Sequence, residues 1–360
     1  VTKDELIDAF PDRCVNTKLL KDNLFPTRSS GSSGHTLRIF VDSMAIAVDT
    51  LQGIRQFWLQ SNGKYTASDV IANVYTVPWW LDRIGDADYS NIFISSLLAP
   101  EKIGTILAEI QPEILSLYPS NLVSIMPHFN PKSLANLQLI VTHSEISSPQ
   151  ERKNLSQQLQ IPVLDEYSSE ELTRIALELQ TGIYHICEDT VRLDIVDPNS
   201  MKVMDMGTGL VVGTNLLNTA MPFIRYVQGD YVTIGAQKPS DITWRQIEKI
   251  EGRQNDAFLS QNGQSIPAGT ILDISYRWMY DIRVNIRQFE IVQTAPNAIR
   301  VTVCEPQLSN NDELTNKSKL HLKKLLEYVL DSDIEMDFIV VDKLENTFKK
   351  WRPIRRAFCK

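Results

Sequence analysis

A run of small hydroxyl and glycine residues near the N-terminus has the composition of a phosphate-binding loop. It follows Arg28, precedes His35 and Thr36, and leads into Leu37 to Val41, whose alternating pattern predicts a strand. Backbone N–H groups of small residues can close around an anion, and hydroxyl groups add donors for phosphate oxygens. A flexible linker or an engineered tag has a similar composition, although a tag is not expected to run directly into a strand. The candidate phosphate ligands are Ser29, Ser30, Gly31, Ser32, Ser33 and Gly34.

A second candidate segment, Asp165 to Glu171 (Asp-Glu-Tyr-Ser-Ser-Glu-Glu), follows the apolar run Ile161 to Leu164, which predicts a buried strand. Ser168 and Glu171 have capping-box spacing, and apolar residues continue with helical periodicity, so the pattern predicts the start of a helix. The same segment offers a tyrosine ring for stacking on a base and a carboxylate for Mg²⁺. The two interpretations are compatible, because α/β proteins usually place ligands beyond a strand end. The apolar series consists of Leu172, Ile175, Ala176 and Leu179.

A third candidate is the acid that ends Met221 to Asp230 (Met-Pro-Phe-Ile-Arg-Tyr-Val-Gln-Gly-Asp). The pattern predicts two short strands, Phe223 to Val227 and Tyr231 to Ile234, separated by a turn at Gln228 to Asp230. An aspartate in such a turn can accept two hydrogen bonds from a ribose diol. It is equally typical of an ordinary turn, so the segment alone leaves both interpretations open.

Basic residues gather near the C-terminus, around Lys349-Lys350-Trp351-Arg352, and half of the last twelve residues are basic. This composition is typical of a solvated cationic tail, and a nucleic-acid patch is the alternative. The net charge of the whole chain is −8, which argues against nucleic-acid binding because neutralising phosphates requires an excess of Lys and Arg.

The chain has 360 residues, of which 43% are hydrophobic and 22% charged, enough for two globular domains. Its apolar runs are too short to span a bilayer, and Val1 to Phe10 lacks the apolar block of a signal peptide. Because the chain starts with valine, we expect that something precedes it. The four cysteines and five histidines show no C-x-x-C or H-x-x-x-H spacing, which disfavours a zinc site or a disulfide framework. A reduced, cytoplasmic enzyme is expected.

Helical and strand patterns alternate along most of the chain and predict an α/β fold. Leu137 to Thr142 and Ile161 to Leu164 resemble buried strands, and Gln150 to Gln160 between them is typical of a helix, so a parallel β–α–β unit is expected. Short strands follow from Val191. A small α+β unit is expected after about Gly252, with strands at Gln288 to Val292, Ile299 to Val303 and Asp337 to Val341 and a helix at Lys317 to Leu330.

In their order along the chain, these segments resemble the motifs of the acyl-adenylate-forming (AMP-binding) superfamily, most closely its phenylacetate–coenzyme A ligase-like branch. Gly182 to Ile186 and Gly209 to Thr214 are also similar to that branch, and Thr36-Leu37 stands where other relatives have Pro-Lys. The resemblance implies a large N-terminal α/β domain with a parallel sheet and a short-stranded β subdomain, plus a small mobile α+β domain. We therefore expect a nucleotide- and acyl-binding core at residues 1–251 and a lid at residues 252–360.

The resemblance also implies residue roles. The loop from Ser29 to Gly34 would hold phosphates, and Asp165 to Glu171 resembles the Tyr-Gly-x-Thr-Glu motif. Tyr167 then falls at the adenine-stacking position with Glu166 beside it as a nucleotide ligand, and Glu171 falls at the catalytic, magnesium-linked acid.

Four further residues fall in the C-terminal motifs. Asp230 falls at the ribose-binding acid, and Arg253, in the Gly-Arg of the interdomain hinge, would contact the ribose or a phosphate. Asn255 belongs to the same hinge. Lys350 falls at the mobile catalytic lysine.

Several positions depart from the family pattern. Ser168 and Glu170 replace the Gly and Thr of the tyrosine motif, and Asn255 stands where Asp is usual. Lys349 replaces the Gly before the lysine, which leaves the register between Lys349 and Lys350 open. These departures put the efficiency of the reaction, or the identity of the nucleotide, in question.

The implied reaction is ATP-dependent activation of a carboxylic acid as acyl-AMP with release of pyrophosphate. Transfer to a thiol of coenzyme A, or of the phosphopantetheine of an acyl carrier protein, would follow after rotation of the small domain. Mg²⁺ is the expected metal, and the resemblance alone favours an aromatic acid. Neither nucleic acid nor a membrane is an expected partner. The identity of the acid stays open; residues in segments that line the acyl site in relatives are Trp79, Trp80, Tyr118 and His143.

The main alternative function is a degenerate relative that binds nucleotide or a partner protein without turnover. Ser168, Glu170 and Asn255 motivate it, since they replace residues that the family motifs contain. A nucleic-acid-binding protein that uses the basic C-terminal tail is a further alternative.

Overall fold

The computed structural model describes residues 1–19, 24–29, 37–76, 90–128, 134–253, 256–266, 268–284, 286, 288–344 and 353–358. The chain divides into two compact units. The first comprises residues 1–228 and 232–249, and the second comprises residues 229–231 and 250–360. The assignment of nucleotide and acyl binding to residues 1–251, and of a lid to residues 252–360, stays a prediction.

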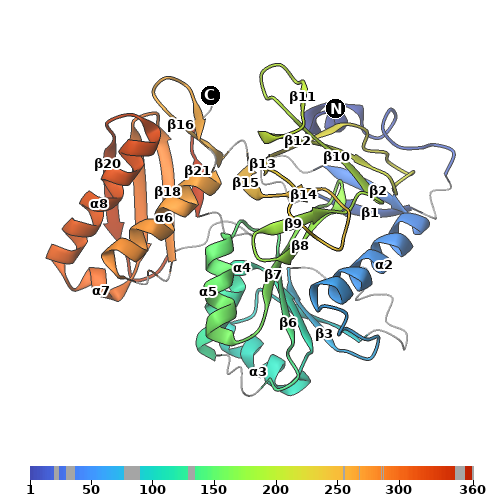
Figure 1. The fold of residues 1–360 in the computed structure, drawn as a ribbon, viewed down its shortest axis with the longest axis horizontal. Coiled ribbons are helices and arrows are strands. Elements are labelled where there is room, and N and C mark those ends of the chain that lie inside the picture. The colour runs from blue at the N-terminus through green and yellow to red at the C-terminus, as the bar shows by residue number, and fades with distance from the viewer. Residues whose placement is uncertain are drawn as a thin grey trace. The chain divides into compact units, whose positions relative to one another are not determined.

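An eight-stranded sheet forms the centre of the first unit (Figure 1), in the order β14-β9-β8-β7-β6-β5-β3-β4. Strands β3 to β7 are parallel to one another, whereas β8, β9 and β14 each pair antiparallel with the strand beside them. This confirms the predicted α/β class with a parallel sheet. The strands are β3 (Ile71–Tyr75), β4 (Asn91–Ser95), β5 (Ile114–Leu117), β6 (Leu139–His143), β7 (Val163–Ser169), β8 (Thr173–Gln180), β9 (Ile183–Ile186) and β14 (Gln246–Ile247).

Helices cover both faces of this sheet. One core cluster joins α3 (Pro100–Ile110), α4 (Pro119–Ile125) and α5 (Pro149–Leu159) to strand residues such as Leu115 and Ile140. A second cluster packs α2 (Ser43–Gln60) against the alternate strand residues, among them Ile114, Leu139 and Val141. Successive side chains of a strand point to opposite faces, so a sheet covered on both faces requires continuous apolar strands. That is why Leu-Ile-Val in β6 is apolar throughout.

The predicted β–α–β unit is confirmed. Helix α5 begins after Ser148, whose hydroxyl accepts a hydrogen bond from the backbone N–H of Glu151, and Pro149 occupies the first helical turn. Gln160, in the left-handed region, ends the helix. Strands β6 and β7 then pair in parallel, with His143 opposite Glu166.

The helix predicted from Ser168 onward is wrong, because residues 173–180 form β8, antiparallel to β7. Five consecutive residues of β8, Arg174 to Glu178, are buried. A central strand that is buried on both faces supplies apolar residues at almost every position, so helical spacing can be found within it by chance. Ser168 is a strand residue in β7 and caps no helix.

A five-stranded sheet has the order β11-β10-β12-β13-β15. The two short strands predicted around Gln228 are one strand, β13, so the predicted turn at residues 228–230 is wrong. Gly229, with φ +84°, takes up the local distortion within the strand, a conformation that glycine adopts without steric cost. The strands are β10 (Val191–Val196), β11 (Val203–Met204), β12 (Gly207–Asn215), β13 (Tyr226–Ile234) and β15 (Lys249–Arg253).

Near the N-terminus, helix α1 (Lys3–Ala9) precedes an antiparallel pair of strands, β1 (Leu24–Arg28) and β2 (Arg38–Asp42). The candidate phosphate loop therefore joins two paired strands. The predicted strand at Leu37 to Val41 agrees with β2.

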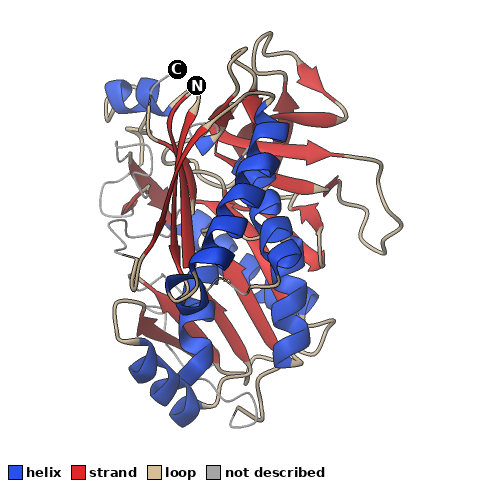
Figure 2. Ribbon diagram, turned by 90° about the vertical axis from the view of Figure 1, so that its left-hand side faces the viewer, coloured by secondary structure: helices blue, strands red, loops and turns tan. Residues whose placement is uncertain are grey.

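The second unit contains a four-stranded sheet in the order β20-β19-β18-β21, with α6 and α8 side by side on it (Figures 1 and 2). Trp278 of α6 is buried, and its indole N–H donates to the backbone carbonyl of Ser318 in α8 at 3.1 Å. The predicted α+β character is confirmed. The elements are β16 (Phe258–Leu259), β17 (Ser265–Ile266), α6 (Ala268–Ile282), β18 (Gln288–Ala295), β19 (Ala298–Cys304), α7 (Pro306–Ser309), α8 (Asp312–Leu330), β20 (Glu335–Val340) and β21 (Ile354–Arg356).

Among the helices of the described ranges, none combines the length and the apolar character needed to cross a membrane.

Candidate active site

An aromatic cluster lies where three parallel strands end. Tyr75 ends β3, Tyr118 directly follows β5, and His143 ends β6. The ring centroids are 5.1 Å apart for Tyr75 and Tyr118, 5.4 Å for Tyr75 and His143, and 5.5 Å for Tyr118 and His143. Burial raises the pKa of both tyrosines, so their hydroxyl groups stay neutral in the physiological range. The carboxyl ends of parallel strands are the usual ligand-binding edge of an α/β sheet.

Glu166, a predicted nucleotide ligand, belongs to an ion-pair network with Arg174 and Asp49. Its Oε2 lies 3.6 Å from Nε of Arg174 in β8, and Arg174 also pairs with Asp49 of α2 at 2.8 Å. Burial raises the pKa of Glu166, but attraction to Arg174 and His143 outweighs it and holds the pKa below its usual value. Glu166 is therefore ionised and fixed in place by Arg174.

Tyr167 and Glu171 flank the connection between β7 and β8. Tyr167 is buried at a register shift between the two strands, where the pairing slips between Tyr167 and Ser168. Such irregularities redirect side chains at the ends of a ladder. Glu171 follows in the turn, after Glu170.

The carboxylate of Glu171 is oriented by the five-stranded sheet. Its Oε1 accepts a hydrogen bond of 3.0 Å from the hydroxyl of Tyr226, and its backbone carbonyl accepts one of 3.0 Å from the side chain of Asn215. Among the described residues, Oε2 of Glu171 has no hydrogen-bond or ion-pair partner. Glu171 is buried, and these two contacts fix the position of its backbone and the direction of its carboxylate. Sequence reasoning missed both contacts, because hydrogen bonds between distant segments leave no local pattern.

The ends of the candidate phosphate loop are fixed by Ser29. Its backbone N–H donates to the carbonyl of Leu37 at 3.0 Å, and its hydroxyl accepts from the N–H of Leu37 at 2.9 Å. On the preceding strand, the hydroxyl of Thr27 donates to Oε2 of Glu170 at 2.9 Å. The structure thus brings the start of the loop to the β7–β8 turn. The loop residues Ser30, Gly31, Ser32, Ser33 and Gly34 lie outside the described residues.

In the second unit, Asp230 and Arg253 form an ion pair, with 2.8 Å between Oδ1 of Asp230 and Nε of Arg253. Asp230 is buried in β13, and Arg253 is partly exposed at the end of β15. The two residues predicted to contact ribose or phosphate are therefore neighbours. Asn255, Lys349, Lys350 and the pair Trp79-Trp80 lie outside the described residues.

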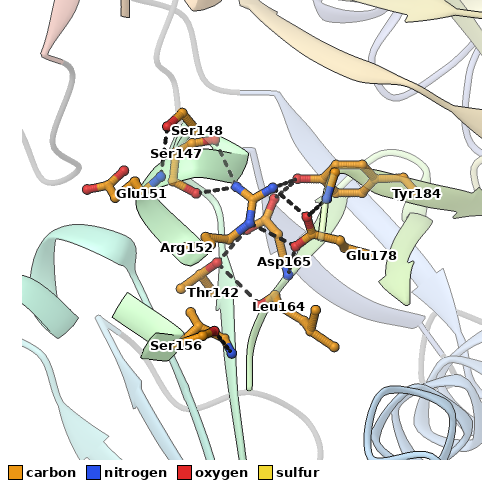
Figure 3. Close-up of polar contacts among 12 residues, drawn as sticks. Thr142, Ser147, Ser148, Glu151, Arg152, Ser156, Leu164, Asp165, Glu178 and Tyr184 are labelled. Carbon is orange, nitrogen blue, oxygen red and sulfur yellow. Dashed lines mark hydrogen bonds and ion pairs between the residues drawn. The ribbon is translucent and has the colours of Figure 1, made fainter. Parts of the chain in front are cut away.

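A buried charge network joins helix α5 to strands of the eight-stranded sheet (Figure 3). The Arg152 guanidinium donates to both carboxylate oxygens of Glu178, at 2.8 Å and 2.7 Å, and to the hydroxyl of Tyr184 at 2.9 Å. That hydroxyl donates to Asp165 at 2.7 Å, and Thr142 donates to the other oxygen of Asp165 at 2.7 Å. Burial raises the pKa of Asp165 to about 6, against the attraction of Arg152. The network ties α5 to strands β6 to β9, and it was also missed from the sequence.

Within the described ranges, no three His, Cys, Asp or Glu side chains converge as a metal site. Mg²⁺ commonly uses one or two protein carboxylates together with phosphate oxygens and water, so it does not require such a group. A single oriented carboxylate such as that of Glu171 fits that kind of ligand.

No family model and no curated protein sequence matches the chain. Several solved structures, however, have a similar fold. Over 99% of this chain and 79% of the other, the fold superposes on 2-hydroxyisobutyryl-CoA ligase in the postadenylation state, with a TM-score of 0.80 and 17% identity.

Two further ligases are similar. ATP-bound MatB from Rhodopseudomonas palustris gives a TM-score of 0.65 at 14% identity, covering 90% of this chain and 65% of that one. Anthranilate CoA ligase in complex with anthranoyl-AMP gives 0.66 at 12% identity, covering 89% and 64%. At these identities the comparison establishes the fold, which is that of the acyl-adenylate-forming ligases and confirms the predicted architecture. The phenylacetate–coenzyme A ligase-like branch stays a prediction.

Proposed function

We propose that this chain activates a carboxylic acid with ATP, forming acyl-AMP and pyrophosphate, and then passes the acyl group to a thiol. The observation that carries the proposal is Glu171, a buried carboxylate that Tyr226 orients through one oxygen, while the other oxygen has no partner among the described residues. It stands in the motif that resembles Tyr-Gly-x-Thr-Glu, on a fold shared with ligases bound to ATP or an AMP adduct.

The chemistry needs positioning and charge stabilisation more than covalent help from the protein. The acid's carboxylate oxygen attacks the α-phosphate, and pyrophosphate leaves. Bound through Glu171 and the phosphates, Mg²⁺ would neutralise phosphate charge. Glu171 would hold one ligand position, with Tyr226 fixing the direction of its carboxylate.

The remaining proposed roles follow the resemblance. The loop Ser29 to Gly34 would donate N–H and hydroxyl groups to the phosphates, with its start held by Leu37. Asp230 would accept hydrogen bonds from the ribose diol, and its ion pair with Arg253 supports a common task for these two residues. Lys350 would bridge the attacking carboxylate and the α-phosphate.

The proposed acceptor is the thiol of coenzyme A or of a carrier protein's phosphopantetheine. The open conformation of 2-hydroxyisobutyryl-CoA ligase, bound to 2-HIB-AMP and CoA, has a TM-score of 0.65 to this chain at 17% identity, which supports the coenzyme A alternative. We propose the aromatic cluster of Tyr75, Tyr118 and His143 as part of the acyl site, and aromatic acids as the first to test. The proposed location is the cytoplasm.

A pyrophosphate-release assay over a panel of aryl and alkyl acids tests the proposal. We expect acid-dependent release with Mg²⁺ and ATP, and a loss on the order of 10²–10³ in rate for Glu171→Gln. Glu188→Gln, which alters a surface carboxylate paired with Arg245, is the matched control and should retain activity. Absence of acid-dependent release across the panel would reject turnover.

A second candidate function, nucleotide binding without turnover, is favoured by one contact. The Glu170 carboxylate, at a position where the family motif has threonine, lies against Thr27 at the start of the phosphate loop. A negative charge there opposes phosphate binding unless a cation compensates it. Calorimetric binding of ATP together with no pyrophosphate release from any acid would support this second function.

A further inference from the structure

The turn between β7 and β8 carries Glu171, and the next residue, Leu172, is completely buried against the five-stranded sheet. Its neighbour there is Gly213 of β12. A Cβ atom added to Gly213 would lie 2.2 Å from Cδ1 of Leu172 and 3.2 Å from its Cγ, and the first distance is far shorter than non-bonded carbon atoms allow. The buried leucine has no free space into which to rotate, because protein interiors are close-packed. Only glycine therefore leaves room for Leu172 at this point of the strand.

The residue after Leu172 has a strained backbone. Thr173 has a φ of +59°, in the left-handed region, which is an outlier for a β-branched residue. Its hydroxyl oxygen is buried and has no hydrogen-bond partner within the described part of the chain. Strained residues persist where the surrounding structure imposes their conformation, and they cluster at functional sites. Contacts from outside the turn are therefore needed to hold it.

The five-stranded sheet supplies such contacts on both sides of the turn. Asn215 of β12 donates to the backbone carbonyl of Glu171 at 3.0 Å. The Ser169 hydroxyl accepts from the backbone N–H of Leu172 at 3.1 Å and donates to Oε1 of Gln228 in β13 at 3.3 Å. These polar contacts fix the backbone of the turn, and the close packing of Leu172 on Gly213 fixes its apolar side chain.

From these observations, we propose that Gly213 is a positioning residue for the carboxylate of Glu171. Because Gly213 has no side chain, Leu172 lies against β12, and this contact keeps the preceding residue where its carboxylate meets the hydroxyl of Tyr226. The inference rests on the proposed role of Glu171 toward Mg²⁺. Gly213 acts through Leu172 and not by contact with a substrate.

Gly213→Ala tests this role, since the added methyl group must displace Leu172 and with it Glu171. We expect the affinity for ATP in the presence of Mg²⁺, measured by calorimetry, to fall about 10-fold. AMP, measured without Mg²⁺, should bind as it does to the wild type. The rate of pyrophosphate release should fall by about the same factor as the affinity for ATP with Mg²⁺. Circular dichroism checks that the variant folds.

Leu172→Ala separates displacement of the turn from loss of the fold. Alone, it should weaken ATP binding in the presence of Mg²⁺, because the turn loses its contact with β12. Adding Gly213→Ala to Leu172→Ala should restore part of that affinity, since the new methyl group meets no leucine and fills part of the vacated space. This comparison decides the proposal even where Gly213→Ala alone does not fold.

The matched control is Gly104→Ala in α3, a helix of the core cluster on one face of the eight-stranded sheet. A Cβ atom at Gly104 would lie 2.6 Å from the backbone carbonyl oxygen of His128, so this substitution overpacks the fold as well. We expect a lower melting temperature and wild-type affinity for ATP in the presence of Mg²⁺.

The proposal is overturned if Gly213→Ala or Leu172→Ala binds ATP with Mg²⁺ as the wild type does, or if combining the two restores nothing. Equal losses for ATP and AMP, or an equal loss in Gly104→Ala, would also overturn it. A wild type whose ATP affinity does not depend on Mg²⁺ would overturn it together with the metal role of Glu171. Magnesium-dependent ATP binding without pyrophosphate release would reject turnover alone, and the binding data would still decide the role of Gly213.

Discussion

At the scale of single residues, the proposed chemistry depends on how Glu171 is held. Tyr226 donates its hydroxyl hydrogen to Oε1 of Glu171, and its ring packs edge-on against Phe223. Tyr226→Phe keeps the ring and removes only this donor. The carboxylate would then rotate more freely, and a freely rotating ligand binds Mg²⁺ less well.

We predict that Tyr226→Phe lowers the rate of pyrophosphate release about 10-fold and raises the Mg²⁺ concentration needed for half-maximal rate. Steady-state kinetics over a magnesium titration measure both effects. Tyr328→Phe is the control, since Tyr328 is 86% exposed on α8. If the Mg²⁺ concentration for half-maximal rate is unchanged in Tyr226→Phe, Glu171 is not a ligand of the metal.

The second prediction at this scale concerns Asp230. Asp230→Ala removes the proposed acceptor of the ribose hydroxyls, and hydrogen bonds to a charged group contribute about 1.5–3 kcal/mol. We therefore expect ATP and AMP to bind about 10- to 100-fold more weakly by calorimetry. Asp194→Ala removes a strand aspartate that is likewise paired with an arginine, Arg225 at 3.1 Å, and should bind as the wild type does. Equal affinity in Asp230→Ala would refute the ribose assignment.

At the scale of elements, the buried network of Arg152 gives a pH dependence. Asp165 has a usual pKa of 3.8 that is raised to about 6 in the fold. Between these values the folded state holds a proton that the unfolded state has lost, so this group's stabilisation is present below about pH 4 and is lost as the pH rises through 6. We predict that wild-type stability declines more steeply than that of Asp165→Asn between pH 4 and pH 6.

Thermal melting of both proteins across this range measures the difference between them. The comparison removes the contributions of titrating groups far from Asp165, which the two proteins share. Parallel curves would mean that Asp165 titrates in the folded state as it does in the unfolded chain.

The elements also show what the sequence can and cannot predict. Local sequence patterns predict an element correctly where residues within that element determine its secondary structure. Ser148 and Pro149 start α5, and Val191 to Val196 forms β10 as expected. The patterns fail at β8, because a strand buried on both faces does not show the two-residue alternation of apolar and polar side chains. They also fail at Gly229, where the positive φ is accommodated within β13 and the chain does not turn.

The candidate site could be predicted only as motifs. The sequence motifs predict roles for Glu171 and Asp230, but they do not reveal the side chains that contact these two residues in the fold. Tyr226 and Glu171 are 55 residues apart, and no local pattern records such a contact. For the same reason the network of Arg152 and Glu178 was missed, since each residue by itself resembles an ordinary surface charge.

At the scale of the whole molecule, the proposal requires two half-reactions that use different residues. The ammonium of Lys350 should matter only while the carboxylate attacks phosphate, because it offsets the charge that builds up between them. Lys350→Ala should therefore abolish acyl-AMP formation, by a factor on the order of 10²–10³. It should still transfer a pre-made acyl-AMP to the thiol.

Lys349→Ala resolves the register. It should leave both half-reactions intact if Lys350 is the catalytic lysine, and loss of adenylation in Lys349→Ala alone would move the role by one residue. Equal loss of both half-reactions in Lys350→Ala would mean that this lysine stabilises the fold and has no specific role in adenylation.

In the proposed reaction the acid's own carboxylate attacks the α-phosphate of ATP, and the fate of a labelled carboxylate oxygen reveals whether it does. When the thiol displaces AMP from an acyl-AMP, the oxygen that bridges the acyl carbon and phosphorus stays with AMP. With a substrate acid labelled with ¹⁸O in its carboxylate, we predict AMP that carries one ¹⁸O atom, measured by mass spectrometry after turnover. ¹⁸O in inorganic phosphate together with ADP, or AMP without label, would contradict it.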